Sequence, residues 1–134
     1  MAHVRAAYPG IPVTDQNCQP FTAGKYMFMH NGGIGGFHKV RRRLLETLRE
    51  DVFELCPSFQ SDSAVSFSMF MNELESPYHN YQPYELVEKV ESVISKIIRI
   101  QSEGGYGEEL SLLNFVVTDG RTVVATRSGV RYRL

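Results

Sequence analysis

The chain of 134 residues has no tryptophan, only two cysteines and no apolar run close to the ~20 residues that a membrane-spanning helix needs. Its 14 Lys and Arg residues nearly balance 15 Asp and Glu residues, which leaves a net charge of −1. This balance provides no attraction to nucleic acid or to an anionic membrane. Two cysteines are too few for a disulfide scaffold and fit a reducing compartment. We therefore expect a cytoplasmic protein that binds neither nucleic acid nor membrane.

Metal and nucleotide signatures are also missing. No HExxH or CxxC pattern occurs among the cysteines and the four histidines, so the sequence predicts no metal site and no cofactor. The glycine run at 32–36 lacks the lysine of a phosphate-binding loop and does not match GxGxxG spacing. A phosphate cradle is therefore disfavoured there.

The chain is long enough for one domain and too short for two. Its apolar periodicity and turn residues predict strands at 2–7, 26–29, 110–118 and 122–126 and helices at 37–50, from Ser61 to Leu74 and at 84–103. Loops are expected at 8–24 and 77–83. Helices grouped between strands indicate an α+β protein with helices layered on an antiparallel sheet.

The segment from Tyr26 to Gly36 organises this pattern, because an apolar strand stops there at a polar, glycine-rich turn. Glycines allow positive φ and let a ligand approach the bare backbone. The Asn31 side-chain amide and the N–H of Gly32 are suited to holding a developing oxyanion. The alternative is a tight strand-to-helix connection in which the glycines only relieve strain.

Other candidates have competing interpretations. Arg5 is suited to a carboxylate ligand, because guanidinium binds carboxylate through two hydrogen bonds, but it equally fits a surface arginine. Asp62 suits an ammonium group, or a helix N-cap. Residues 41–43 are three consecutive arginines, which fit a phosphate patch or, better, a solvated helix face. Cys18 and Cys56 are conceivable nucleophiles, although packing better explains Cys56.

Five segments in order resemble the class II glutamine amidotransferases, which are N-terminal-nucleophile hydrolases. The similarity is closest to the branch that cleaves γ-glutamyl bonds in glutathione breakdown. It rests on His3-Val4-Arg5-Ala6-Ala7, Asn17-Cys18-Gln19-Pro20-Phe21, Phe28-Met29-His30-Asn31-Gly32-Gly33-Ile34, Ser61-Asp62-Ser63 and Asn114-Phe115-Val116-Val117-Thr118-Asp119-Gly120.

The resemblance implies a four-layer αββα sandwich with antiparallel sheets and helices on the outside. It implies that an N-terminal cysteine attacks the amide carbon and that its own α-amine is the base. By motif, Asn31 and Gly32 resemble the oxyanion hole, Arg5 resembles the residue that pairs with the substrate α-carboxylate, and Asp62 resembles the residue that binds the α-ammonium.

The chain also departs from the family pattern. Gln19 stands where many members have histidine, and Ala64 stands where an acidic residue commonly follows the Asp-Ser pair. The family places its nucleophilic cysteine upstream of the His-Val-Arg segment, and this sequence has none there. We therefore expect residues 1–134 to be a partial glutamine amidotransferase type 2 domain without the nucleophile segment and the C-terminal tail.

Two functions follow as expectations. The parent protein is an enzyme that hydrolyses a γ-glutamyl amide of glutamine or of a glutathione-type substrate, in the second case with a peptidase-like partner subunit. Alternatively, the chain is a catalytically inactive remnant that binds γ-glutamyl compounds or a partner.

Overall fold

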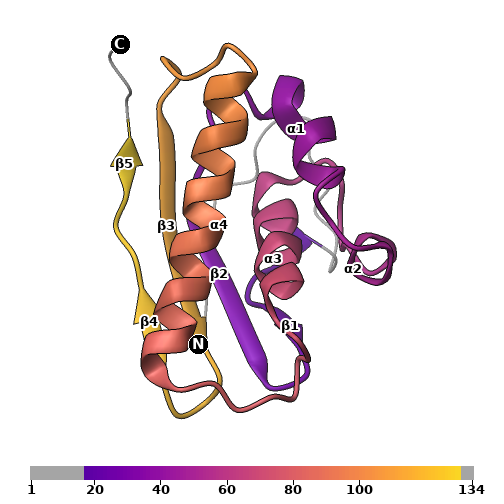
Figure 1. The fold of residues 1–134 in the computed structure, drawn as a ribbon, viewed down its shortest axis with the longest axis vertical. Coiled ribbons are helices and arrows are strands. Elements are labelled where there is room, and N and C mark those ends of the chain that lie inside the picture. The colour runs from indigo at the N-terminus through magenta and orange to yellow at the C-terminus, as the bar shows by residue number, and fades with distance from the viewer. Residues whose placement is uncertain (1–16, 131–134) are drawn as a thin grey trace.

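The computed structural model describes residues 17–130, which form an antiparallel sheet with helices on one of its faces (Figure 1). The elements in chain order are β1 (Phe21–Ala23), β2 (Tyr26–Gly33), α1 (Phe37–Leu45), α2 (Glu50–Glu54), α3 (Asp62–Glu73), α4 (Pro83–Glu103), β3 (Ser111–Thr118), β4 (Val123–Ala125) and β5 (Gly129–Val130). The predicted α+β class, with helices on an antiparallel sheet, is confirmed. Arg5 and the strand predicted at 2–7 lie outside the described residues.

The sheet is built around the long strands β2 and β3, which pair from Met27↔Thr118 to Gly33↔Leu112. Strand β1 pairs with the other side of β2, while β4 and β5 both pair with the far side of β3. Between β4 and β5 the Thr126 hydroxyl accepts the N–H of Phe115 and donates to the Leu113 carbonyl, both at 2.9 Å. Backbone bonds from the Leu113 N–H to Ser128 and from the Thr126 N–H to Phe115, both at 2.9 Å, also attach this stretch to β3, and the hydroxyl supplements them where the edge strand is divided.

One face of the sheet packs against the helices and forms the core. Tyr26, Phe28 and His30 alternate along β2 and are all buried. Phe28 lies at the centre, with ring centroids 5.0 Å from Phe115 and 5.8 Å from Phe70 of α3. Alternate strand residues point to opposite faces, so the inward position of Phe28 also directs its second neighbour, His30, toward α3.

The opposite face of the sheet has no covering element within residues 17–130 (Figure 1). It carries the other half of the alternation, and its side chains are half-buried or exposed: Met27, Met29 and Asn31 of β2, and Leu112, Asn114 and Val116 of β3. This open face is mainly apolar, but two asparagines interrupt it side by side, since Asn31 pairs with Asn114 in the ladder.

The helices begin and end where local chemistry predicts. Helix α3 starts after Ser61, whose hydroxyl accepts the N–H of Ala64 at 3.3 Å. Helix α4 starts with Pro83, and Glu85 reaches back to the N–H of Gln82 at 2.6 Å. It ends at Glu103, before the glycines at 104 and 105. None of the helices among the described residues is long and apolar enough to cross a bilayer.

The helix predicted at 37–50 is wrong in its second half. Helix α1 ends at Leu45, and the separate helix α2 covers Glu50–Glu54. The Thr47 hydroxyl donates to the Leu44 carbonyl at 2.7 Å, and Asn72 accepts the N–H of Arg49 at 2.7 Å. These side-chain bonds replace the helical ones and stop the helix. The short strands β1 and β5 were not predicted.

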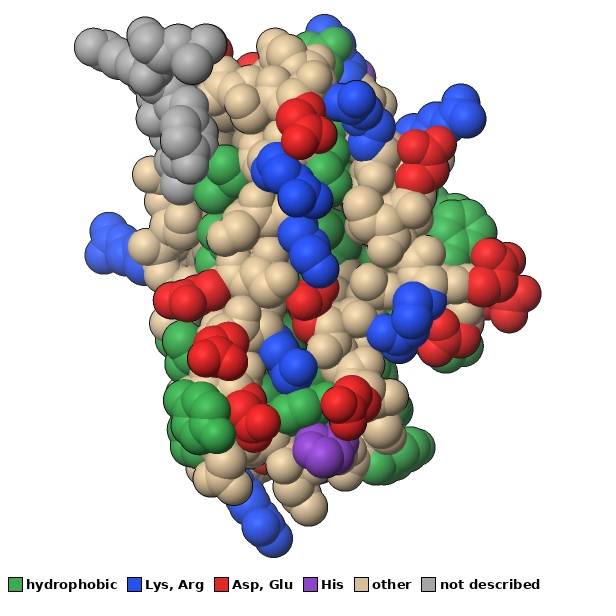
Figure 2. Space-filling model, viewed as in Figure 1, with side chains coloured by type: hydrophobic (Ala, Val, Ile, Leu, Met, Phe, Trp, Pro, Cys, Tyr) green, Lys and Arg blue, Asp and Glu red, His purple; other side chains and the backbone are tan. Residues whose placement is uncertain are grey.

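The arginines at 41–43 lie on a helix surface of mixed charge. Figure 2 shows Lys and Arg side chains interspersed with Asp and Glu over the helical face. The Arg41 guanidinium bonds to the Gln60 side chain, and Arg42 Nε lies 2.9 Å from Glu46 Oε1. Partners within the chain therefore account for two of the three guanidinium groups, which favours the solvated face over a phosphate patch.

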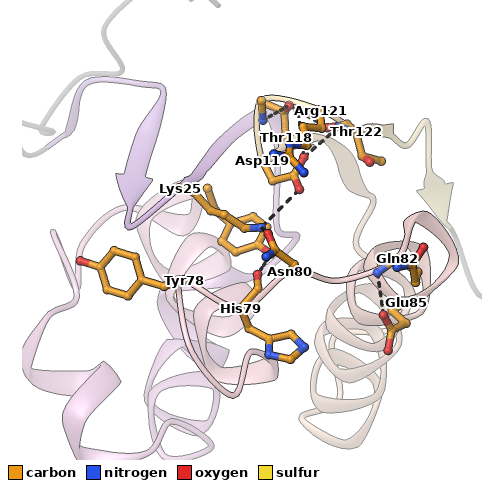
Figure 3. Close-up of polar contacts among 12 residues, drawn as sticks. Lys25, Tyr78, His79, Asn80, Gln82, Glu85, Thr118, Asp119, Arg121 and Thr122 are labelled. Atoms are coloured by element: carbon orange, nitrogen blue, oxygen red, sulfur yellow. Dashed lines mark hydrogen bonds and ion pairs between the residues drawn. The ribbon is translucent and has the colours of Figure 1, made fainter.

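A partly buried ion pair lies at the β3–β4 turn, at the end of the sheet away from Gly33 (Figure 3). Asp119, in the β3–β4 turn, accepts the N–H groups of Arg121 and Thr122 at 3.0 and 2.8 Å, and its other oxygen lies 3.5 Å from Lys25 Nζ. Lys25 Nζ also donates to Asn80 at 2.5 Å. Burial alone would raise the pKa of Asp119, but these backbone bonds and the Lys25 charge outweigh it and hold that pKa below its usual value.

We predict that Asp119→Ala lowers the free energy of unfolding by about 2 kcal/mol at pH 7, because two hydrogen bonds to a charged acceptor are lost. The folded-state pKa is lowered, so this contribution is complete above the unfolded-state pKa of about 4 and disappears as the pH falls through the folded-state value. Urea titrations from pH 7 to pH 2 should show the gap to wild type narrowing at the acid end.

The exposed Glu91→Ala is the control, and its stability should stay close to that of wild type. A gap between Asp119→Ala and wild type that is constant at every pH would contradict the assigned role of the Asp119 charge.

Candidate functional site

The strand predicted at 26–29 is too short: β2 continues to Gly33, so Asn31, Gly32 and Gly33 are strand residues paired with β3, and the turn itself follows at 34–36. Gly32 has φ 141°, and a Cβ there would lie 2.0 Å from the carbonyl oxygen of Leu112. Both the conformation and the contact require glycine at this position. Asn31 and Gly32 are exposed, so the close approach leaves both residues accessible to solvent.

The peptide group between Asn31 and Gly32 has a defined direction. Its carbonyl oxygen accepts a hydrogen bond from Asn114 Nδ2 at 2.8 Å and therefore points toward β3. In a planar trans peptide the N–H points opposite to the C=O. The N–H of Gly32 is therefore directed away from β3, toward the edge of the sheet beyond β2.

The Asp62 carboxylate lies at the end of β2, beside the backbone of Gly33 and Ile34. Its Oδ2 accepts the N–H of Ile34 at 3.1 Å, and its Oδ1 accepts the N–H of Ser63 at 2.7 Å. A Cβ added to Gly33 would lie 3.3 Å from Oδ2, so the carboxylate rests against the Gly33 backbone. The N-cap of α3 is Ser61 and not Asp62. Each carboxylate oxygen of Asp62 can therefore accept a further hydrogen bond from a ligand.

The buried His30 side chain joins the turn to two other segments. Its Nδ1 lies 3.0 Å from the Ser63 hydroxyl oxygen, and its Nε2 lies 3.0 Å from the Leu112 carbonyl oxygen. A carbonyl oxygen can only accept, so Nε2 carries the hydrogen, and a neutral ring then accepts at Nδ1 from Ser63. The imidazole thus connects β2 to β3 and to the first turn of α3, which carries Asp62.

The segment before β1 is attached to β2 through the side chain of Gln19. Its Oε1 accepts the N–H of His30 at 2.6 Å, and its Nε2 donates to the His30 carbonyl at 3.1 Å. The primary amide therefore pairs with β2 as a short strand would. The adjacent Cys18 is exposed.

A chain of hydrogen bonds supports the turn beyond Gly33. The N–H of Gly35 donates to the Ser111 hydroxyl at 2.9 Å, which donates to Gln101 Oε1 at 2.8 Å. Gln101 Nε2 then donates to the Glu109 carbonyl at 2.7 Å. Ser111 and Gln101 are buried, and these hydrogen bonds satisfy their polar groups. The same bonds connect the turn to α4, which carries Gln101.

The roles assigned to the predicted site residues stay predictions, and the structure shows where the described ones lie. Asn31, Gly32 and Asp62 lie together at one corner of the sheet, while Arg5 lies outside the described residues. Sequence reasoning gave no role to His30 and did not single out Asn114. The signal for His30 was available, because strand alternation from Tyr26 and Phe28 directs it inward.

The second cysteine is unsuited to nucleophilic chemistry. Cys56 is half-buried after α2, and burial raises the pKa of its thiol above the usual value, so the neutral thiol is favoured. Within residues 17–130 no group of three His, Cys, Asp or Glu side chains is arranged to hold a metal ion. What the described residues offer at this corner is hydrogen-bond donors beside a carboxylate.

The fold agrees with the similarity to known proteins. The family described as class-II glutamine amidotransferases matches residues 1–133, and the chain belongs to this family.

Two known proteins show the extent of this similarity. The chain is 35% identical over 136 residues to the "Probable glutamine amidotransferase DUG3" of Saccharomyces cerevisiae, with 94% of this chain and 38% of the yeast protein covered. A solved structure of a glutamine aminotransferase class-II domain protein from Silicibacter pomeroyi superposes with a TM-score of 0.69 at 22% identity, covering 87% of this chain and 49% of that chain. The bacterial structure supports the fold. The chain spans less than half the length of either relative.

We predict that Gly32→Ala destabilises the protein by more than about 3 kcal/mol or prevents folding, because left-handed strain of about 1–2 kcal/mol adds to the clash with Leu112. Gly120→Ala is the matched control, since φ there is 86° but nothing lies within 4 Å of an added Cβ. It should cost only the strain. Urea denaturation of both variants tests this, and equal losses would rule out the close approach as the reason for glycine at position 32.

Proposed function

We propose that this chain forms the glutamyl-binding and oxyanion-stabilising part of a γ-glutamyl amide hydrolase of the class-II amidotransferase family. In this proposal Asn31 Nδ2 and the N–H of Gly32 hold the oxyanion, Asp62 binds the substrate α-ammonium and Arg5 binds its α-carboxylate. The proposal is carried by one observation: the Asn31–Gly32 peptide turns its N–H away from β3 at the corner where Asp62 lies against Gly33.

Two donors of different origin support the oxyanion role. The Asn31 side chain stands on the open face of the sheet, and the N–H of Gly32 points to the adjacent edge. A carbonyl oxygen located at this corner can accept from both. Such fixed donors stabilise the charge that develops in the transition state, and removing one from an enzyme typically costs roughly 10²–10³-fold in kcat.

Charge at the corner supports recognition of an amino acid. The Asp62 carboxylate is fixed by two backbone N–H groups rather than by a cationic side chain of the described residues, so its negative charge remains for an ammonium group. An arginine for the α-carboxylate would complete the recognition of a glutamyl group, and Arg5 is our candidate.

The attacking group must combine a thiol with a free α-amine, and neither cysteine of the chain meets that need. Cys18 is an internal residue, and Cys56 is half-buried. We therefore assign the attack to an N-terminal cysteine of the full-length protein. Its sulfur adds to the γ-carbonyl carbon, the amine leaves with the proton from the thiol, and water hydrolyses the resulting thioester to glutamate.

The substrate class follows from these contacts. They specify the glutamyl group and leave the departing amine open, so glutamine, which releases ammonia, and glutathione, which releases a dipeptide, both fit. Glutathione breakdown with a peptidase-like partner subunit is the specific activity we propose, based on the resemblance of the sequence segments to that branch.

We predict that Asp62→Asn weakens binding of L-glutamine to the full-length protein by about 10-fold, or 1.4 kcal/mol, because the ammonium loses its ionic partner. Isothermal titration calorimetry with glutamine, glutathione and D-glutamine measures this. Asp51→Asn, another carboxylate in the first turn of a helix, is the matched control and should bind as wild type does.

Release of glutamate from glutamine or glutathione, measured alongside, separates two outcomes. Binding with glutamate release supports the hydrolase, whereas binding without release indicates a γ-glutamyl-binding protein that has lost catalysis. Identical titrations for wild type and Asp62→Asn would remove the proposed role of Asp62.

A further inference from the structure

We infer that Asn114 is a positioning residue for the oxyanion site, acting through the peptide group between Asn31 and Gly32. This inference rests on the proposed function and adds to it a residue that does not touch the substrate. Its basis is the hydrogen bond from Asn114 Nδ2 to the Asn31 carbonyl oxygen, which measures 2.8 Å.

The location of this bond gives it a specific consequence. Asn31 and Asn114 are direct partners in the β2–β3 ladder, and both side chains lie on the open face of the sheet. The carbonyl that receives the Asn114 amide belongs to the same peptide unit as the N–H of Gly32. Fixing the oxygen therefore fixes the direction of the N–H, since the unit is planar and trans.

This peptide group needs such support because glycine follows it. Gly32 has φ 141°, whereas residues in an ordinary strand have negative φ. Glycine also gives the chain more conformational freedom than any other residue. A side-chain donor on the Asn31 carbonyl adds to the ladder pairing of Asn31 with Asn114 and opposes rotation of the peptide plane next to this glycine.

The same bond strengthens the donor. Hydrogen bonds in a chain polarise one another, so a donor on a peptide carbonyl makes the N–H of that peptide a better donor. An oxyanion bound to Gly32 would therefore be stabilised partly through Asn114. Neighbouring positions on β3 cannot do this, because Val116 lies on the same face opposite Met29 and has no polar group.

The test compares Asn114→Leu, which keeps a similar size but removes the donor, with Val116→Ala, which shortens a neighbour on the same strand and face. Both are made in the full-length protein. We expect Asn114→Leu to lower kcat for glutamine hydrolysis about 10-fold with KM within about twofold, a smaller effect than loss of an oxyanion donor itself. Val116→Ala should retain the wild-type kcat.

A second measurement does not depend on activity. In protein labelled with ¹⁵N-glycine, the Gly32 amide proton resonance should move upfield in Asn114→Leu and stay in place in Val116→Ala, because the carbonyl of its peptide loses a hydrogen bond only in the first variant. A general loss of packing would instead shift many glycine resonances in both variants and would change kcat and KM together.

The outcomes separate the two proposals. If the wild-type protein releases no glutamate, the proposed hydrolase function fails, and the Gly32 resonance alone decides whether Asn114 orients the peptide. In an active protein, a drop in kcat together with a displaced resonance supports the role of Asn114. An unchanged kcat in active protein, or an unmoved Gly32 resonance in any case, overturns it.

Discussion

The arrangement of the candidate site depends on one buried imidazole. His30 connects β2 to the carbonyl of Leu112 on β3 and to the hydroxyl of Ser63 at the start of α3. Helix α3 carries Asp62 and β2 carries Asn31, so the ring helps to set the position of α3 relative to β2. A buried polar ring is costly unless its nitrogens are satisfied, and here both have partners. The same requirement makes the link specific, because a shifted α3 would leave the imidazole or the hydroxyl unpaired.

The site is built mainly from backbone rather than from mobile side chains. The turn lies against β3 through glycine, the Asp62 carboxylate is oriented by the N–H groups of Ile34 and Ser63, and Gly35 is bonded to the buried Ser111. Preorganised donors do not need to be ordered when a ligand binds, so their full strength is available to it. Such an arrangement suits the function proposed above, in which one small glutamyl group is recognised by direction as well as by charge.

Periodicity predicted most of the fold, because the long elements bury one face each. The strand at Tyr26, the helix that follows Ser61 and the helix that ends before Gly104 were all recognised from apolar spacing and capping residues. The errors have local causes. The break after Leu45 depends on Asn72, which is distant in sequence and captures the N–H of Arg49, and β1 is too short to show a period. Within the site, glycines and charges were visible in the sequence, but the bond from Asn114 to Asn31 depends on strand register.

Gln19 has a consequence for how the protein responds to its surroundings. Its amide offers one donor and one acceptor to the backbone of His30, as another peptide group would. A histidine at this position, which the resemblance leads us to expect in many family members, has one acceptor nitrogen while its ring is neutral and loses it on protonation near pH 6.5. Glutamine does not titrate. The hydrogen bonds of Gln19 to β2 therefore do not depend on the protonation of the Gln19 side chain. With a histidine at this position, the attachment of the segment to β2 would depend on pH.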